Sequence, residues 1–203
     1  MTKPRLLLLA GLLALGSRSG AQISVQSGGS LRIEGDSTLH KWSSTATVVA
    51  MTFQLMDGAP ASLTEAIKAS KVKSMEVSIP VAGLKSGDSG LDRNLRNAMK
   101  EKKFPNVVYR LVRYETAKGA GEGIVPANTA GELTIAGRTR TVTMDVVFRL
   151  SPDGASVSGS CPLNMSDYGI EPPKLLLGAI KVRDPITIRF DLFLKPDDAR
   201  TKP

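Results

Sequence analysis

The side chains that could do chemistry are few, and their spacing does not assemble a catalytic site. His40 is the only histidine, and no nucleophile elbow or phosphate-binding loop is present. Ser37 and His40 could form a nucleophile–base pair, but a separation of three residues places them on opposite faces of a continuous strand. Asp36 and His40 share a face, yet they would lie about 13 Å apart at the rise of a strand. We therefore predict that the chain is not an enzyme.

Metal and thiol chemistry are equally restricted. One histidine and one cysteine are too few for a His/Cys metal site, and no carboxylates cluster at ligand spacing, so we predict no metal and no cofactor. Cys161 has no partner for an intramolecular disulfide. It falls on the apolar side of an alternating run, which favours a buried, inert thiol. A thiol that reacts or joins two copies of the chain in a dimer is the alternative.

The first residues have the pattern of an export signal. Lys3 and Arg5 precede an apolar run of about ten residues, which is too short to span a bilayer, and small residues follow at 19–21. We expect residues 1–21 to be a signal peptide, with no transmembrane segment remaining after cleavage. No cysteine follows the signal, which argues against a lipid anchor. The pattern predicts an exported protein.

The charge balance indicates a preference for anionic surfaces. The full chain carries a net charge of +8, and the predicted leader removes three basic residues and no acidic one, which leaves +5. An excess of this kind favours anionic surfaces such as lipid headgroups. Aromatic residues make up only 4% of the chain and no stacking motif appears, so we predict no nucleic-acid partner.

Alternation of apolar and polar residues predicts an all-β fold. In the clearest run, every second residue from Val142 to Leu150 is apolar. Two-residue periodicity of this kind gives eight candidate strands, near 30–36, 44–56, 72–82, 106–116, 128–136, 140–150, 154–165 and 184–195. Gly137 predicts a tight hairpin between the fifth and sixth strands. We expect a single domain over 22–195 and a flexible tail over 196–203.

A short helix interrupts the strands at about 90–103. Ser89 and Asp92 have the spacing of a capping box, and Leu91, Leu95 and Met99 form an apolar stripe. The Phe-Pro pair at 104–105 should end the helix. A second short helix is indicated around 63–69.

Eight antiparallel strands can close into a lipocalin-like barrel, which removes both sheet edges. A barrel of this size either fills with its own side chains or encloses one small ligand, and alternation alone leaves both open. The side chains predicted to point inward and line a channel are Met51, Phe53, Leu55, Met75, Val77, Ile79, Met144, Val146, Phe148, Met165 and Phe190.

Four segments, in order along the chain, resemble the YceI-like family of exported polyisoprenoid-binding proteins. They are IEGDSTLHKW (33–42), GLDRNLR (90–96) leading to KFP (103–105), GELTIAGRTRTV (131–142), and MSDYGI (165–170) followed by IKVRDPI (180–186). The family's fold is an eight-stranded, lipocalin-like barrel with an apolar channel, so the resemblance favours a cavity over a filled core. Asn94 departs from the family, whose members often carry histidine in this helix.

The resemblance implies a non-covalent ligand, an isoprenoid or other long-chain lipid of the quinone or prenyl-phosphate type. The matching segments offer four candidates for contact with its headgroup at the channel mouth: His40, Asp92, Arg96 and Asp167. Each could instead bond a loop, cap the helix or form a surface pair. A bacterial source and a periplasmic location follow from the family, with secretion as the alternative. The competing function is an envelope module with a packed core that binds protein partners and no lipid.

Overall fold

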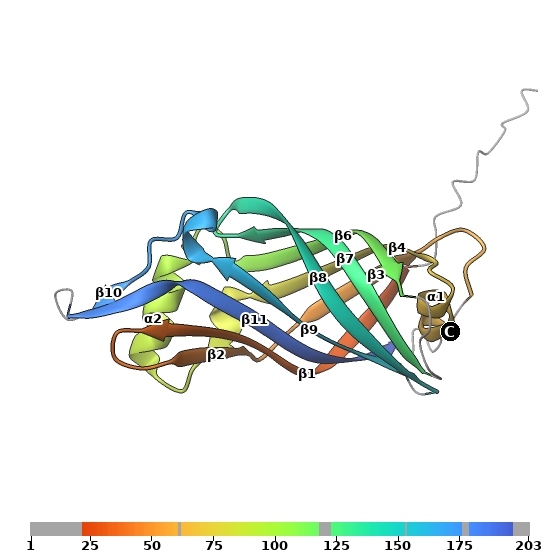
Figure 1. Cartoon of the computed structure of the whole chain (residues 1–203), viewed down its shortest axis with the longest axis horizontal. Helices are drawn as coiled ribbons and strands as arrows, with labels where there is room; N and C mark the ends of the chain where they lie inside the picture. The colour runs from red at the N-terminus through yellow and green to blue at the C-terminus, as the bar shows by residue number, and fades with distance from the viewer. Residues whose placement is uncertain (1–21, 61, 118–122, 153, 176–178, 197–203) are drawn as a thin grey trace, which may run out of the picture.

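The structure is a computed structural model that describes residues 22–60, 62–117, 123–152, 154–175 and 179–196. The predicted signal peptide at 1–21 and residues 197–203 of the predicted tail lie outside the described residues. Long antiparallel strands curl around one elongated interior, with a helix at each end (Figure 1).

Eight of the described strands form a closed ring through antiparallel pairing. The order around the ring is β1, β3, β4, β6, β7, β8, β9 and β11, and β11 pairs with β1 to complete it. The bounds are β1 Gln22–Ser37, β3 Ala50–Leu55, β4 Val72–Pro80, β6 Asn106–Thr116, β7 Ile124–Ile135, β8 Arg138–Ser151, β9 Gly154–Asn164 and β11 Ile180–Pro196. The predicted eight-stranded antiparallel barrel is confirmed.

The predicted strand at 44–56 is divided in two. β2 (Trp42–Ala46) pairs with the second half of β1, whereas β3 pairs with its first half. Between them the Thr47 amide donates to the carbonyl of Gly83, at 2.9 Å, beside the two-residue strand β5 (Leu84–Lys85). A second two-residue strand, β10 (Lys174–Leu175), pairs with the start of β11.

The alternating apolar and polar residues of the strands point to the inside and the outside of the barrel, respectively. Along β7 every second residue from Val125 to Ile135 is buried, and the residues between are exposed or half-buried. The turn from β7 to β8 consists of Ala136 and Gly137, which both have positive φ, +50° and +78°. Two central residues of this kind define the hairpin turn that suits twisted strands, as the glycine predicted.

The helices end earlier than the sequence predicts. α2 spans Ser89–Ala98, and its N-cap is Asp88, whose carboxylate accepts from the Leu91 amide at 2.7 Å. Past Ala98 the chain turns at Lys100, with φ +56°, where the Lys100 amide donates to the carbonyl of Asn97 and the next amide reaches back to Arg96. This Schellman pattern ends the helix five residues before the predicted end at 103. The lysine at the left-handed position gives no sequence signal, because glycine normally marks it.

Apolar side chains pack closely at the end of the barrel next to α1. α1 (Leu63–Lys68) lies at the opposite end of the barrel from α2 and packs against β9 (Figure 1). Its Leu63 and Ile67 are at most 2% exposed, as are Phe53 and Leu55 of β3. Two short 3-10 turns complete the described elements, η1 (Val81–Gly83) and η2 (Met165–Tyr168). None of the described helices has the length and apolar character needed to cross a membrane.

Candidate functional site

Two cavities lie in the rest of the barrel interior. One cavity, the mid-barrel cavity, lies between the sheet walls and holds about 780 Å³ of free space, counting space open to solvent. A second, the α2 cavity, lies between the barrel and α2 and holds about 890 Å³ on the same basis. Leu31, Ile79, Val107 and Ile188 line both cavities, which therefore adjoin along the barrel axis. The interior can accommodate a ligand longer than either cavity alone.

Several inward-pointing side chains are incompletely covered, which is the signature of free space. Met75, Met144 and Phe190 line the mid-barrel cavity, yet each is only half-buried. Leu194, at the α1 end of the same sheet, is fully buried. Because close-packed interiors leave few voids larger than a water molecule, this contrast separates a packed end from a hollow middle.

The structure places nine of the eleven predicted channel residues in the cavity walls. Those in the wall of the mid-barrel cavity, the α2 cavity or both are Met51, Met75, Val77, Ile79, Met144, Val146, Phe148, Met165 and Phe190. Phe53 and Leu55 are buried in the end of the barrel beside α1 and line neither of these two cavities. Contact of all eleven with a lipid stays a prediction.

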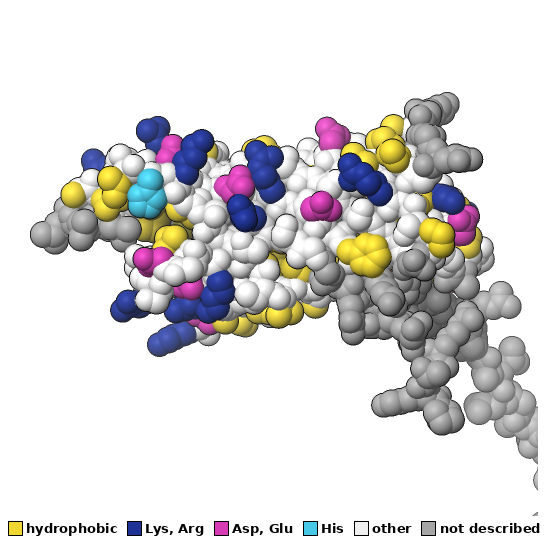
Figure 2. Space-filling model, turned by 90° about the horizontal axis from the view of Figure 1, so that it is seen from below, with side chains coloured by type: hydrophobic (Ala, Val, Ile, Leu, Met, Phe, Trp, Pro, Cys, Tyr) yellow, Lys and Arg dark blue, Asp and Glu magenta, His cyan; other side chains and the backbone are white. Residues whose placement is uncertain are grey.

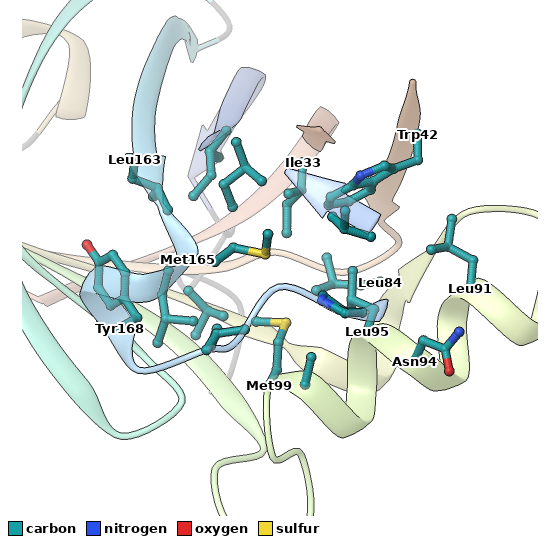
Figure 3. A pocket seen from close by; sticks show the side chains of 18 of the residues that line it. Ile33, Trp42, Leu84, Leu91, Asn94, Leu95, Met99, Leu163, Met165 and Tyr168 are labelled. Carbon is teal, nitrogen blue, oxygen red and sulfur yellow. The ribbon is translucent and has the colours of Figure 1, made fainter. Parts of the chain in front are cut away.

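Much of the α2 cavity comes from residues that the sequence did not assign to the channel. Leu91 and Leu95 of α2 form one wall together with Met99, which follows the helix (Figure 3). Trp42 of β2 and Tyr168 of η2 lie on other sides of the same cavity (Figure 3). The apolar stripe of α2 could have predicted this wall, because an amphipathic helix in an all-β chain buries its apolar face against the barrel.

Two of the four headgroup candidates are exposed. Figure 2 shows the single histidine, His40, on the outer surface toward the α2 end. Its backbone carbonyl accepts from the amide and hydroxyl of Ser37, at 3.1 and 2.8 Å, which closes the β1–β2 loop. Asp167 is exposed in η2, and its carbonyl accepts from Arg140 Nε at 2.9 Å. Neither residue lines the two cavities.

The other two candidates belong to the frame of α2. Asp92 is buried, and its carboxylate accepts from the hydroxyl and the amide of Ser86, at 2.6 and 2.8 Å. The pKa of Asp92 is lowered, first by the Ser86 hydroxyl and then by the Ser86 amide. Arg96 Nε lies 3.6 Å from a carboxylate oxygen of Glu101. Neither side chain lines the two cavities, so headgroup contact by any of the four stays a prediction.

The cavity walls are almost entirely apolar. Among the described residues, no charged side chain lines either cavity. The lining residues that carry a polar atom are Trp42, Asn94 and Tyr168 in the α2 cavity and Tyr109, Thr129 and Cys161 in the mid-barrel cavity. Burial raises the pKa of Tyr168 to about 12, helped by the charge that Cys161 would carry if ionised. The walls suit a long apolar molecule.

Cys161 faces the interior and not the outer surface. Its side chain lines the mid-barrel cavity and is 3% exposed, and burial raises the pKa of its thiol. This environment agrees with an inert thiol. Within the described part of the chain, no three histidine, cysteine, aspartate or glutamate side chains are grouped so that they could hold a metal ion.

Solved structures share this fold at low sequence identity. BcnA from Burkholderia cenocepacia superposes with a TM-score of 0.62 at 18% identity, over 82% of this chain and 95% of that one. A polyisoprenoid-binding domain from Saccharophagus degradans, described as implicated in plant cell wall breakdown, gives 0.62 at 12% identity, over 86% and 99%. A YceI protein from Campylobacter jejuni gives 0.50 at 18% identity, over 74% and 83%.

Sequence comparison assigns the family. No curated protein sequence matches the chain. The model of the YceI-like domain matches residues 27–194, which is most of the chain and nearly the whole barrel. The chain therefore belongs to the YceI-like domain family.

Proposed function

We propose that this chain is an exported, periplasmic binding protein, without catalytic activity, that holds a long-chain lipid inside its barrel. An isoprenoid of the quinone or prenyl-phosphate type is the expected ligand. The observation that carries the proposal is the pair of adjoining cavities whose described walls contain no charged side chain. Membership of the YceI-like family and the shared fold with a polyisoprenoid-binding domain support it.

The physical chemistry favours an unbranched or prenyl tail over a compact polar molecule. Each methylene moved from water to an apolar wall contributes about 0.8 kcal/mol, so an isoprene unit contributes a few kcal/mol before its ordering cost. A few buried units can then support micromolar binding without any charged contact. Methionines in the wall, Met51, Met75 and Met144 among them, can adapt to the irregular outline of such a tail.

The direct test is recovery of a lipid from the protein. The chain from Gln22 onward is purified from a bacterial periplasm, extracted with organic solvent and analysed by mass spectrometry, and uptake of an added prenyl quinone is measured in parallel. We expect a co-purifying prenyl lipid, saturable quinone uptake, or both. Absence of both contradicts the proposal and favours the protein-binding module.

A matched pair of variants tests whether the lipid lies inside the barrel. Val146 is buried and lines the mid-barrel cavity, whereas Val147, next to it on β8, points to the other face of the sheet. Val146→Trp fills the cavity and should weaken quinone uptake at least about tenfold, the effect of roughly 1.4 kcal/mol. Val147→Trp should leave uptake unchanged. Circular dichroism checks that both variants keep the β fold.

A further inference from the structure

The α2 cavity is open to solvent at the end of the barrel that carries α2. Leu91 and Leu95 of α2 line it at this end, as do Trp42, Pro173 and Val182 from the segments around β2, β10 and β11. All five are only half-buried, and Figure 1 shows that these segments form the α2 end of the barrel. We call the opening among these five residues the mouth.

A lipid held in the two cavities has to leave its polar group at the mouth. The wall of the α2 cavity exposes almost only apolar atoms, and no charged side chain is among the described residues that line it. A polar group placed against such a wall loses its hydrogen bonds to water and gains none in exchange. The tail therefore belongs in the cavities, and the headgroup belongs at the mouth.

Exposed cations flank the mouth. Four of them are sequence neighbours of residues that line the α2 cavity: Lys41 beside Trp42, Arg93 beside Asn94, Lys100 beside Met99, and Lys181 beside Val182. Lys102 and Lys103, which are also exposed, follow in the turn after α2. We call these six cations the basic rim, and none of them forms an ion pair with a described residue. Figure 2 shows lysine and arginine side chains near His40, at this end of the barrel.

Most acidic side chains at this end are held by other groups of the protein. Three form ion pairs, at 3.6 or 3.7 Å, with cations outside the basic rim: Asp36, Glu101 and Glu171. Three others accept hydrogen bonds from backbone amides or serine hydroxyls: Asp88, Asp92 and Asp184. Asp167, exposed in η2, is the exception. The basic rim therefore keeps a net positive charge.

An exposed apolar side chain accompanies the basic rim. Leu39 is 66% exposed, the highest value among the large apolar side chains of the described residues. Two hydrogen bonds hold its loop against β11: the Thr38 amide donates to the Lys181 carbonyl at 3.0 Å, and the Lys181 amide donates to Thr38 Oγ1 at 3.1 Å. Binding to a bilayer interface combines the burial of such apolar groups with attraction between cations and anionic lipids.

We propose that the basic rim and Leu39 dock the mouth on the surface of a bilayer that contains anionic phospholipids, so that a lipid tail passes directly between bilayer and barrel. The transfer step rests on the proposed lipid-binding function, whereas the docking does not. Passage of the tail through water is unfavourable, because each exposed methylene lowers the partition about fourfold. An acidic protein is the other partner that suits a basic surface, but the apolar cavity that opens between these cations favours a bilayer.

Vesicle flotation of the chain from Gln22 onward tests the docking. The protein should float with vesicles of phosphatidylcholine and phosphatidylglycerol but not with vesicles of phosphatidylcholine alone, and high salt should release it. The rim variant carries Arg93→Gln, Lys100→Gln and Lys181→Gln. Its partitioning should be at least about tenfold weaker, because each cation near an anionic surface contributes about fivefold.

A control variant loses the same charge at the other end of the barrel. It carries Lys71→Gln, Lys73→Gln and Arg149→Gln, three exposed cations without an ion pair to a described residue, near the α1 ends of β4 and β8 (Figure 1). Its partitioning should stay well above that of the rim variant. Equal losses in the two variants overturn the docking. Failure of the wild type to float with either kind of vesicle also overturns it and leaves an acidic protein as the partner.

A fluorescent label reports which end of the barrel contacts the bilayer. An environment-sensitive dye is attached through Leu39→Cys or, at the α1 end, through Asp57→Cys, while the buried Cys161 stays unlabelled. With anionic vesicles, emission from position 39 should brighten and shift to the blue, because the dye enters the apolar interface. Emission from position 57 should not change. The reverse pattern, or no change at position 39 while the protein floats, overturns the proposed orientation.

Two quinone assays separate the docking from the proposed function. Delivery of a prenyl quinone from anionic vesicles should be at least about tenfold slower to the rim variant than to the wild type, in proportion to the lost partitioning. Uptake of quinone dispersed without vesicles should be the same in both, because the basic rim lies outside the cavities. Equal delivery rates overturn direct transfer from the bilayer. Absence of uptake from either source contradicts the proposed function, and flotation still tests the docking.

Discussion

At the scale of single residues, side chains divide into those that build the frame and those that line the cavities. Asp92 belongs to the frame, because both hydrogen bonds from Ser86 join the chain before α2 to its first turn. Trp42 and Tyr168 belong to the wall of the α2 cavity, which exposes almost only apolar atoms. Loss of a frame residue should therefore affect stability, and loss of a wall side chain should affect ligand binding.

The Asp92→Asn variant tests the frame role through its pH dependence. The folded-state pKa of Asp92 is lowered from 3.8, so the ionised carboxylate stabilises the fold above that value and this contribution is lost as the pH falls through the folded-state pKa. In thermal melts the wild type should have the higher Tm at pH 7, and the gap should shrink below about pH 4. Asp57→Asn, in an exposed turn, is the control and should show no gap. A pH-independent gap for Asp92→Asn would contradict this role.

The sequence motifs identified these residues but did not predict in which direction their side chains point. Asp92 and Asp167 stand in the segments that resemble the family, but the three-dimensional contacts of each are made with residues 6 and 27 positions away. Trp42 also stands in a matched segment, and its indole packs over Gly35 of the neighbouring strand, in the wall of the α2 cavity. Spacing along a chain could not distinguish these cases, since orientation at a loop or strand end depends on packing.

At the scale of elements, strands were the most predictable feature. Alternation gave all eight strands of the ring, because one face of each strand meets a common interior. The division of one strand into β2 and β3 was not predicted, since the bond from Thr47 to Gly83 joins distant parts of the chain. The cap of α2 was placed one residue late, because both Asp88 and Ser89 are good capping residues and only geometry selects Asp88.

The β7–β8 hairpin should be sensitive to its glycine. Gly137 has φ +78°, and a Cβ there would collide with the ring of Phe104. Gly137→Ala should lower the free energy of unfolding by about 2–4 kcal/mol, from the left-handed backbone and the collision together. Gly58→Ala is the matched control, because Gly58 has φ +72° and open space around it, so only about 1–2 kcal/mol should be lost. If denaturant unfolding gives equal losses of free energy for the two variants, a Cβ at residue 137 does not collide with Phe104.

At the scale of the whole molecule, the barrel combines a packed end with a remainder that holds two cavities. The alternation in the sequence was compatible with either a lipocalin-like channel or a filled core. Each of these describes one part of the interior. Side chains beside α1 meet and exclude space, whereas those between the middle of the barrel and α2 do not. Composition could not reveal this division, because the same apolar residue types line both regions.

Truncations at the two regions should have unequal effects on stability. Leu55 is 2% exposed in the packed end, so Leu55→Ala should cost about 2–5 kcal/mol. Met144 faces free space and is half-buried, so Met144→Ala should cost less than about 1.5 kcal/mol. Urea unfolding of the ligand-free protein measures both. Comparable losses would mean that the middle of the barrel is packed as tightly as its closed end.

The most direct measurement is a crystal structure of the chain from Gln22 onward, grown with a saturating prenyl quinone. Continuous density is expected to run from the α2 cavity, past the residues shared by the two cavities, into the mid-barrel cavity. Side chains that touch across the barrel axis, with no density along it, would contradict the account.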